Sequence, residues 1–144
     1  MAKQVKMLSD FIEGVEMQDI YILESSVVRD ENFYPPANLS DSAEYAYLNI
    51  NNGFKVYLDH LIKTVEKNKK KPGLSIYVRY LAIYESKFEM TDDLFKKFSK
   101  TNLVLDTWPY LRQHIYDVSL NIGLPPFMLQ MKVSYSPKRN NKSK

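Results

Sequence analysis

The chain of 144 residues contains no cysteine, only four glycines and only two histidines. Without cysteine there can be no disulfides, thiolate nucleophiles or thiolate metal sites, and this composition is typical of a reducing compartment. The glycines, at positions 14, 53, 73 and 123, are scattered, so there is no glycine-rich phosphate-binding loop. His60 and His114 each lack a second histidine three or four residues away, so the sequence shows no histidine pair at metal-ligand spacing.

Long hydrophobic runs are also missing. No stretch approaches the roughly 18 apolar residues of a membrane-spanning helix, and the first residues, MAKQVKMLSDFIEG, lack the apolar core of a signal peptide. Apolar residues make up 44% and charged residues 26% of the chain, as in ordinary globular domains. We therefore expect a single cytoplasmic domain over residues 1–137, with no membrane insertion.

The formal net charge of +3 comes from one end of the chain. Residues 138–144, KRNNKSK, hold four basic residues and no acid, and subtracting their four charges from +3 leaves −1 for residues 1–137. A second basic cluster, Lys67–Lys71, precedes the turn pair Pro72-Gly73. We expect a solvated hairpin turn and a basic disordered tail rather than a nucleic-acid site, which stays the minor alternative.

Catalytic groups are equally scarce. Asp92-Asp93 follows Thr91 and precedes an apolar helical pattern, so this pair indicates a helix start with favourable charge rather than a catalytic dyad. With no triad, metal-ligand cluster or phosphate loop in the sequence, we expect no enzymatic activity, no cofactor and no metal.

Three segments favour strands. Residues 11–28 alternate with a change of phase near Gln18–Asp19, which indicates a β-bulge. Residues 74–88 alternate as a strand covered on both faces for part of its length. Residues 54–66 fit a helix or a strand, although the turn at 67–73 favours a hairpin.

Residues 29–53 are expected to form a long connection. The segment is polar and contains Pro35-Pro36 and Asn52-Gly53, yet it is rich in apolar and aromatic residues, so it is expected to pack on something. After the last helix, Leu129–Tyr135 alternates again and predicts a short extended segment.

Two helices are expected after the hairpin. Thr91 is the predicted N-cap of a short helix that ends near Thr101-Asn102. A long helix then starts with Thr107 or Trp108 as its cap, has Pro109 in its first turn and ends before Gly123.

The long helix is apolar on two sides. Leu111, Ile115, Val118 and Ile122 share an arc of about 60° at 100° per residue. Tyr116 and Leu120 project from nearly the opposite side, and therefore require a second cover from the same chain or from another subunit.

The same stretch resembles the SecB protein-export chaperones. Trp108-Pro109-Tyr110-Leu111-Arg112 is similar to the F-P-Y-A-R segment that opens the family's long helix. Residues 123–129, GLPPFML, are similar to the G-T-F-P-x-L-x-L segment that follows it. The layout of residues 11–135 agrees as well, and the resemblance assigns residues 54–66 to a strand.

The resemblance implies an α+β fold, in which a four-stranded antiparallel sheet packs on the long helix, with a short second helix. It also implies a homotetramer, a dimer of dimers, with Trp108, Tyr116 and Leu120 at the oligomer interface. The implied function is that of an ATP-independent chaperone, a holdase that binds unfolded polypeptides in apolar grooves. The residues that it places in the groove are Phe33, Tyr34, Leu39, Tyr45, Tyr47, Phe127, Met128 and Met131.

Two departures from the family pattern affect the expected partners. The sequence ends in SYSPKRNNKSK, where the family has a lid helix and an acidic tail, so we expect that this lid helix is missing. Asp19 matches the acidic surface that docks the SecA motor, but Arg79 stands where an acid is expected. The expected partners are thus unfolded clients with either SecA or an antitoxin. The alternative is an adaptor of the same fold that binds one folded partner.

Overall fold

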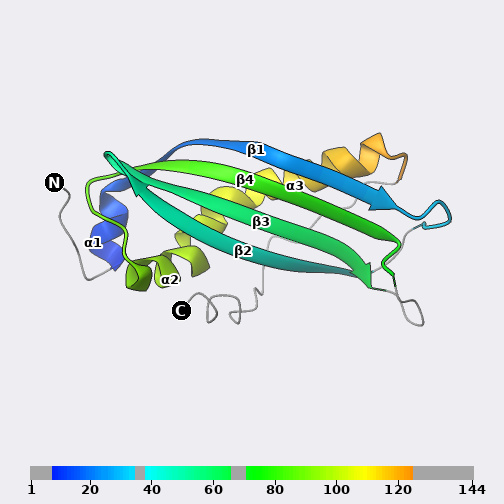
Figure 1. The fold of residues 1–144 in the computed structure, drawn as a ribbon, viewed down its shortest axis with the longest axis horizontal. Coiled ribbons are helices and arrows are strands. Elements are labelled where there is room, and N and C mark those ends of the chain that lie inside the picture. Colours follow the sequence, from blue (N-terminus) through cyan, green and yellow to red (C-terminus); the bar gives the residue numbers. More distant parts are fainter. Residues whose placement is uncertain (1–7, 35–37, 66–70, 125–144) are drawn as a thin grey trace.

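The structure, a computed structural model, describes residues 8–34, 38–65 and 71–124. Its elements in chain order are α1 (Leu8–Glu13), β1 (Val15–Arg29), β2 (Asn38–Ile50), β3 (Gly53–Val65), β4 (Leu74–Ser86), α2 (Asp92–Lys100) and α3 (Asn102–Asn121). The four strands form one antiparallel sheet of order β1-β4-β3-β2, and α3 runs behind it (Figure 1). The predicted α+β fold, a four-stranded antiparallel sheet with helices, is confirmed. The Lys67–Lys71 cluster, apart from Lys71, and the predicted segments after Leu124 lie outside the described residues.

The long strand β1 contains the predicted bulge. Its register against β4 shifts between Met17 and Asp19, and again between Ile22 and Glu24, a second irregularity that the sequence pattern did not predict. Each extra residue changes which side of the strand faces the helices. The strand begins at Val15 rather than at Phe11, because residues 8–13 form α1, a short helix that was also not predicted.

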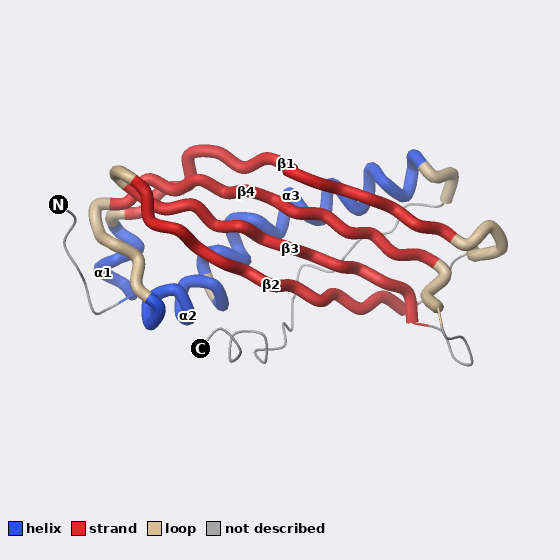
Figure 2. The backbone as a smooth tube through the Cα atoms, in the orientation of Figure 1, coloured by secondary structure: helices blue, strands red, loops and turns tan. Residues whose placement is uncertain are grey.

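The prediction of a long connection over residues 29–53 was wrong. Asn38–Ile50 is strand β2, which pairs with β3 from Asn38 opposite Val65 to Ile50 opposite Gly53. The crossover from β1 is therefore short, and it carries the chain from one edge of the sheet to the other (Figure 2). Asp41 and Asn49, residues depleted in strands, stand on the helix-facing side and obscured the alternation of the segment.

Strands β3 and β4 form the predicted hairpin and lie at the centre of the sheet. Their even-numbered residues, such as Phe54, Leu58 and Ile76, are buried against the helices, while the odd-numbered ones point to the other face and are mostly half-buried. Leu81 is an exception on that other face, since it is only 6% exposed. The assignment of residues 54–66 to a strand is thus confirmed.

The short helix α2 begins as predicted. The side chain of Thr91 accepts a hydrogen bond from the backbone N–H of Leu94, and Asp92 and Asp93 lie in the first turn. Leu94, Phe95 and Phe98 are buried beneath the sheet end.

The predicted start of the long helix was wrong. Helix α3 already begins at Asn102, so Thr107 is no cap and Pro109 lies inside the helix. Pro109 has no N–H to donate to the carbonyl of Leu105, four residues earlier, and the helix continues despite that missing bond. Thr107 is buried and donates its hydroxyl hydrogen to the carbonyl of Leu103.

The predicted end of α3 is confirmed. Gly123 has a φ of +77°, in the left-handed region. Its N–H donates to the carbonyl of Leu120, and the N–H of Leu124 donates to the carbonyl of Ser119. This pair of bonds is the Schellman motif, and the buried Leu124 supplies its apolar contact.

Helix α3 is tied to one half of the sheet. Tyr80 and Tyr84 of β4 donate hydrogen bonds to the carbonyl of Tyr110 and the carboxylate of Asp106, and Ser25 of β1 lies 3.1 Å from Nε2 of His114. In the other half of the sheet, Asn49 and Tyr47 of β2 donate hydrogen bonds to the loop before α2 and to α2 itself. The helix-facing side of β2 thus meets α2 and the loop before it.

Candidate functional site

Strand β2 forms one edge of the sheet, and β3 is its partner among the described residues. In an antiparallel pair, every second residue turns its N–H and C=O away from the partner strand. Along its other edge β2 thus presents backbone groups to which an added strand could hydrogen-bond.

The side of β2 that faces the helices is mostly apolar. Its odd-numbered residues alternate with exposed residues such as Ser42, Glu44 and Leu48, and they lie opposite the buried residues of β3. We call the following set the β2 surface: Leu39, Asp41, Ala43, Tyr45 and Tyr47. All except the fully buried Ala43 are half-buried. This surface therefore offers apolar contact area that a ligand can partly reach from solvent.

A pocket of about 210 Å³ closes the β2 surface at the end nearest α2. Its walls are Tyr45, Ala46 and Tyr47 from β2 and Asp92, Phe95 and Lys96 from α2. The rings of Tyr47 and Phe95 pack with centroids 4.8 Å apart, and the Tyr47 hydroxyl donates a 2.7 Å hydrogen bond to Asp92. The pocket thus has two aromatic walls, with a carboxylate and an ammonium group at its rim.

Burial and the hydrogen bond to Asp92 raise the pKa of the Tyr47 phenol to about 12. The phenol is therefore neutral near neutral pH and remains a hydrogen-bond donor. This contact fixes α2 against the edge strand and so holds the pocket open between two elements that are far apart in the sequence.

The predicted groove residues do not all lie together. Leu39, Tyr45 and Tyr47 share the β2 surface, as expected for a common site. Phe33 is 2% exposed and belongs to the core, whereas Tyr34 is 63% exposed in the crossover. The other three, Phe127, Met128 and Met131, lie outside the described residues.

A buried His–Asp pair on this surface was not predicted. Nδ1 of His60, on β3, lies 3.3 Å from Oδ1 of Asp41, and the His60 side chain is 2% exposed. The ring of Tyr45 packs edge-on to the imidazole, with centroids 5.8 Å apart. The spacing of 19 residues between Asp41 and His60 carried no signal, because their contact depends on the β2–β3 register.

A second apolar stripe follows α3. At 100° per residue, Leu105, Pro109, Tyr116 and Leu120 fall on the side opposite the core-facing residues. Leu105 is 69% and Leu120 is 50% exposed. The stripe was predicted from Tyr116 and Leu120 alone, and Leu105 was missed because the helix was expected to start after it. Trp108, also predicted for this contact, is instead 6% exposed in the chain's own core.

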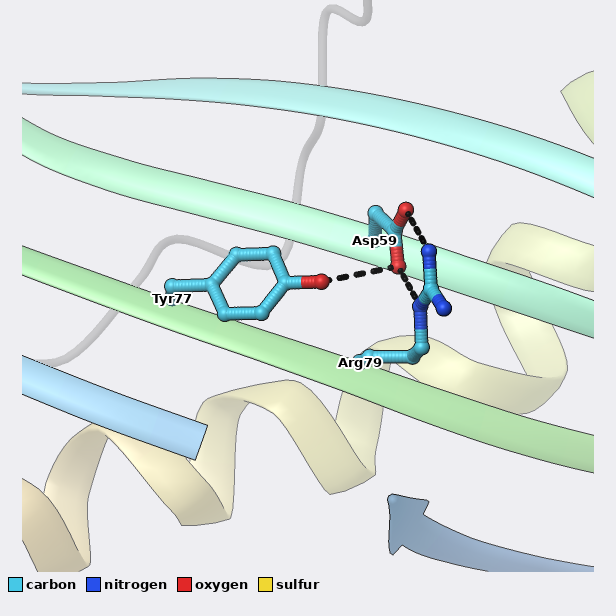
Figure 3. Close-up of polar contacts among 3 residues, drawn as sticks. All are labelled: Asp59, Tyr77 and Arg79. Atoms are coloured by element: carbon cyan, nitrogen blue, oxygen red, sulfur yellow. Dashed lines mark hydrogen bonds and ion pairs between the residues drawn. The ribbon is translucent and has the colours of Figure 1, made fainter. Parts of the chain in front are cut away.

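The sheet face away from the helices carries a small charged cluster (Figure 3). Arg79 donates from Nε and from a terminal nitrogen to the two oxygens of Asp59, at 2.6 and 2.9 Å, and the Tyr77 hydroxyl donates to Oδ1. The hydrogen bond from Arg79 lowers the pKa of Asp59 below its usual value. Arg79, which stood where an acid was expected, thus neutralises an acid on the next strand. Asp19 is exposed on β1 and accepts a hydrogen bond from the N–H of Ile20.

A larger cavity, of about 480 Å³, lies at the end of the sheet. Most of its lining residues are polar, among them Glu13, Glu16, Glu85 and Lys87, and no aromatic residue lines it. We therefore favour the smaller pocket beside β2. Among the described residues, no cluster of histidine and acidic side chains could hold a metal ion, and no helix is long and apolar enough to cross a membrane.

Comparisons with known proteins identify the fold but no family. No family model matches the chain, and no curated protein matches it in sequence. Among solved structures, it is similar to the Mycobacterium tuberculosis Rv1957 SecB-like chaperone in complex with a ChAD peptide from the Rv1956 HigA1 antitoxin. The TM-score is 0.70 at 15% identity, over 85% of this chain and 90% of that chain. A protein of unknown function from Streptococcus agalactiae matches with a TM-score of 0.49 at 12% identity, over 81% of this chain and 96% of that one, and supports no argument. The chain therefore has a SecB-like fold.

Proposed function

We propose that this protein is an ATP-independent chaperone of the holdase type, which binds extended, unfolded polypeptides along the β2 surface. The observation that carries the proposal is the combination of a sheet-edge strand, half-buried aromatic rings and an adjoining pocket on a SecB-like fold. It acts without a cofactor and without catalysis, in the cytoplasm.

Physical chemistry supports such a role for this surface. A bound strand can satisfy its backbone through the edge of β2, and this bonding is independent of side-chain identity. Tyr45 and Tyr47 add large contact areas that are tolerant of the partner's shape. Binding of this kind favours many extended sequences over one, as a holdase requires.

The experiment is suppression of aggregation. A chemically unfolded model protein is diluted into buffer with stoichiometric amounts of the chain, and light scattering is recorded. We expect scattering to fall with the wild-type chain and to return with Leu39→Gln combined with Tyr45→Gln. The matched control is Leu48→Gln, on the opposite side of the same strand, which should behave as wild type. No suppression by the wild-type chain would refute the proposal.

A second candidate is a dedicated adaptor that binds one partner. It is favoured by the structural neighbour, whose bound peptide comes from a single antitoxin. Titration with several unrelated unfolded proteins separates the two functions, since a holdase suppresses aggregation of most of them and an adaptor of none. Direct assays with purified SecA and with an antitoxin peptide then test these two partners, the former with Asp19→Asn as the variant.

We also propose self-association through the second stripe of α3, as a dimer of dimers. Leu105 and Leu120 are large exposed apolar side chains on one helix face, and a partner subunit would remove them from water. Burial of such a side chain contributes about 1.5–3 kcal/mol.

A further inference from the structure

We propose that Ser25 and His114 form a pH-sensitive latch between the edge strand β1 and α3, which is closed while the imidazole is neutral and opens when it takes up a proton. The latch holds the second half of β1, residues 24–29, against the helix. This inference concerns a conformational change of the chain alone and is independent of the proposed function.

The latch joins two elements that are far apart in the sequence. Nε2 of His114 on α3 lies 3.1 Å from Oγ of Ser25 on β1. Further along, Nη1 of Arg29 donates a 2.7 Å hydrogen bond to the carbonyl of Ile122, so the end of α3 lies beside the end of β1 (Figure 1). Among the described residues, β4 is the only strand paired with β1. Contacts with α3 therefore help to hold the second half of this edge strand in place.

The second register shift of β1 turns Ser25 towards the helix. Before the shift, Ile22 lies on the side of the sheet that faces the helices. After it, Ser25 lies opposite the buried Val78 on that side, whereas Glu24 lies on the other face. Without the extra residue, Glu24 would take the helix-facing position instead. The shift thus gives the imidazole a hydroxyl rather than a carboxylate as its partner.

The groups that face His114 from α3 and β4 do little to stabilise a charged ring. Burial lowers the pKa of His114, and Asp117, one turn further along α3, opposes that effect only in part. The Asp117 carboxylate also accepts a hydrogen bond from Gln113. From β4, Tyr80 donates its hydroxyl hydrogen to the carbonyl of Tyr110. Burial raises the pKa of the Tyr80 phenol, so this group is neutral near neutral pH.

The second half of β1 supplies no carboxylate on this side either. Its charged residue on the helix-facing side is Arg29, whose terminal nitrogens donate to the carbonyls of Ile122 and Phe33. An imidazolium in the closed latch therefore loses part of its hydration without gaining an anion from the strand.

Protonation shifts the balance between the closed and the open latch. A neutral imidazole can accept the hydroxyl hydrogen of Ser25 at Nε2, whereas an imidazolium has only donors. The open state hydrates the charged ring, so its pKa lies near the ordinary 6.5, while that of the closed state is lower. The latch is thus fully stable above pH 6.5 and weakens as the pH falls below 6.5. The loss levels off once the pH is below the pKa of the closed state.

Opening exposes apolar side chains on both sides of the latch. Ile22 and Leu23, at the register shift, are 41% and 46% exposed, and Tyr110 on α3 is 46% exposed. Val27, which is half-buried on the helix-facing side of β1, joins them when the strand leaves the helix. The apolar surface that the chain presents thus grows in acid.

NMR titration of the full chain tests the protonation step. The chain contains only two histidines, so their ring Cε1–H signals can be assigned with the variants His60→Gln and His114→Gln. We expect the His114 signal of the wild type to titrate below pH 6.5. Titration at or above that value would overturn the inference.

Hydrogen exchange tests the opening step. Protection factors, which correct for the intrinsic effect of pH on exchange, are measured for the amides of residues 24–29 from about pH 7.5 to about pH 5. We expect them to fall about tenfold for each pH unit by which the pKa of His114 lies below 6.5, while those of the central strand β3 stay constant. Protection of residues 24–29 that does not change with pH would refute the latch.

Two variants assign the response to one imidazole. His114→Gln keeps a side chain that can bond to Ser25 but does not titrate, so protection should become independent of pH. His60→Gln removes the other histidine, which is buried on β3, and should keep the response of the wild type. A response that is lost in His60→Gln contradicts the inference. This comparison decides even where His114→Gln does not fold, because His114 is then the sole imidazole that can titrate.

Discussion

The hydroxyl of Tyr47 donates a 2.7 Å hydrogen bond to Asp92, and this bond joins the edge strand β2 to the first turn of α2. Thr91 caps the same turn, so the carboxylate that receives the bond lies at a helix end with fixed geometry. Both residues line the pocket beside the β2 surface.

Tyr47→Phe removes this bond but keeps the ring against Phe95. We expect a loss of about 1 kcal/mol in unfolding free energy, because a hydrogen bond to a charged acceptor is lost at a partly exposed site. Chemical denaturation at neutral pH measures it. Tyr34→Phe, at an exposed position in the crossover, is the control and should change nothing.

Because the pKa of Tyr47 is raised, the stability of the fold should depend on pH in the alkaline range. Because its folded value, about 12, exceeds the ordinary value of 10.0, the phenol stabilises the fold fully below pH 10, and this contribution is lost between pH 10 and 12. The stability difference between wild type and Tyr47→Phe should therefore shrink over that interval. A difference that stays constant to pH 12 would contradict the assignment.

Arg79→Met should raise the pKa of Asp59 towards its ordinary value of 3.8, since the main cause of the lowered pKa is the hydrogen bond from Arg79. A lowered carboxyl pKa stabilises the fold above the unfolded value, and the contribution is lost as the pH falls through the folded one. The variant should thus lose less stability than wild type when the pH is lowered below 3.8. Carbon-detected NMR titration of Asp59 checks the shift directly.

Gly123→Ala should destabilise the chain by about 1 kcal/mol, because its φ of +77° is unfavourable for a residue with a side chain. An added Cβ would meet nothing within 4 Å, so the cost is conformational rather than steric. Gly123→Asn should cost less than Gly123→Ala in thermal unfolding, since asparagine tolerates this region better. Equal costs would point to a steric cause instead.

Gly73→Ala should also destabilise the chain, here through a steric clash rather than through an unfavourable backbone conformation. The added Cβ would overlap the ring of Phe33, which is buried in the crossover. Overpacking of this kind costs about 1–3 kcal/mol. The check is chemical denaturation of Gly73→Ala, of Phe33→Leu and of the double variant. Because leucine is smaller than phenylalanine, Gly73→Ala should cost less unfolding free energy in the Phe33→Leu background than in the wild type. Additive losses would show that the ring is not the obstacle.

If α3 associates through its exposed stripe, Leu120→Lys should lower the mass of the assembly that analytical ultracentrifugation measures. A lysine there leaves the monomer core unchanged, because Leu120 is half exposed. Asn121→Lys, on the exposed polar side of the same helix and about 100° from Leu120, is the control. An unchanged mass for Leu120→Lys would place any association elsewhere.

Local chemistry made several features of this protein predictable. The Thr91 cap, the Gly123 terminus and the phase change near Asp19 depend on residues close together in the chain, and each is confirmed. The start of α3 was mispredicted because a proline usually indicates a first turn. Here the preceding residues of the helix, such as Leu103 and Val104, are buried, and their packing outweighs that local preference.

The functional surface was predicted in part. The sequence by itself determined the start of α2, the end of α3, the central hairpin and an excess of aromatic residues between positions 33 and 47. The tertiary structure alone decided that this segment is an edge strand, that Phe33 turns into the core while Tyr45 and Tyr47 stay half-buried, and that Asp41 meets His60. The physical reason is that strand pairing and register join residues far apart in the chain. The burial of one side chain and the access left to its neighbour depend on those pairings rather than on local preference.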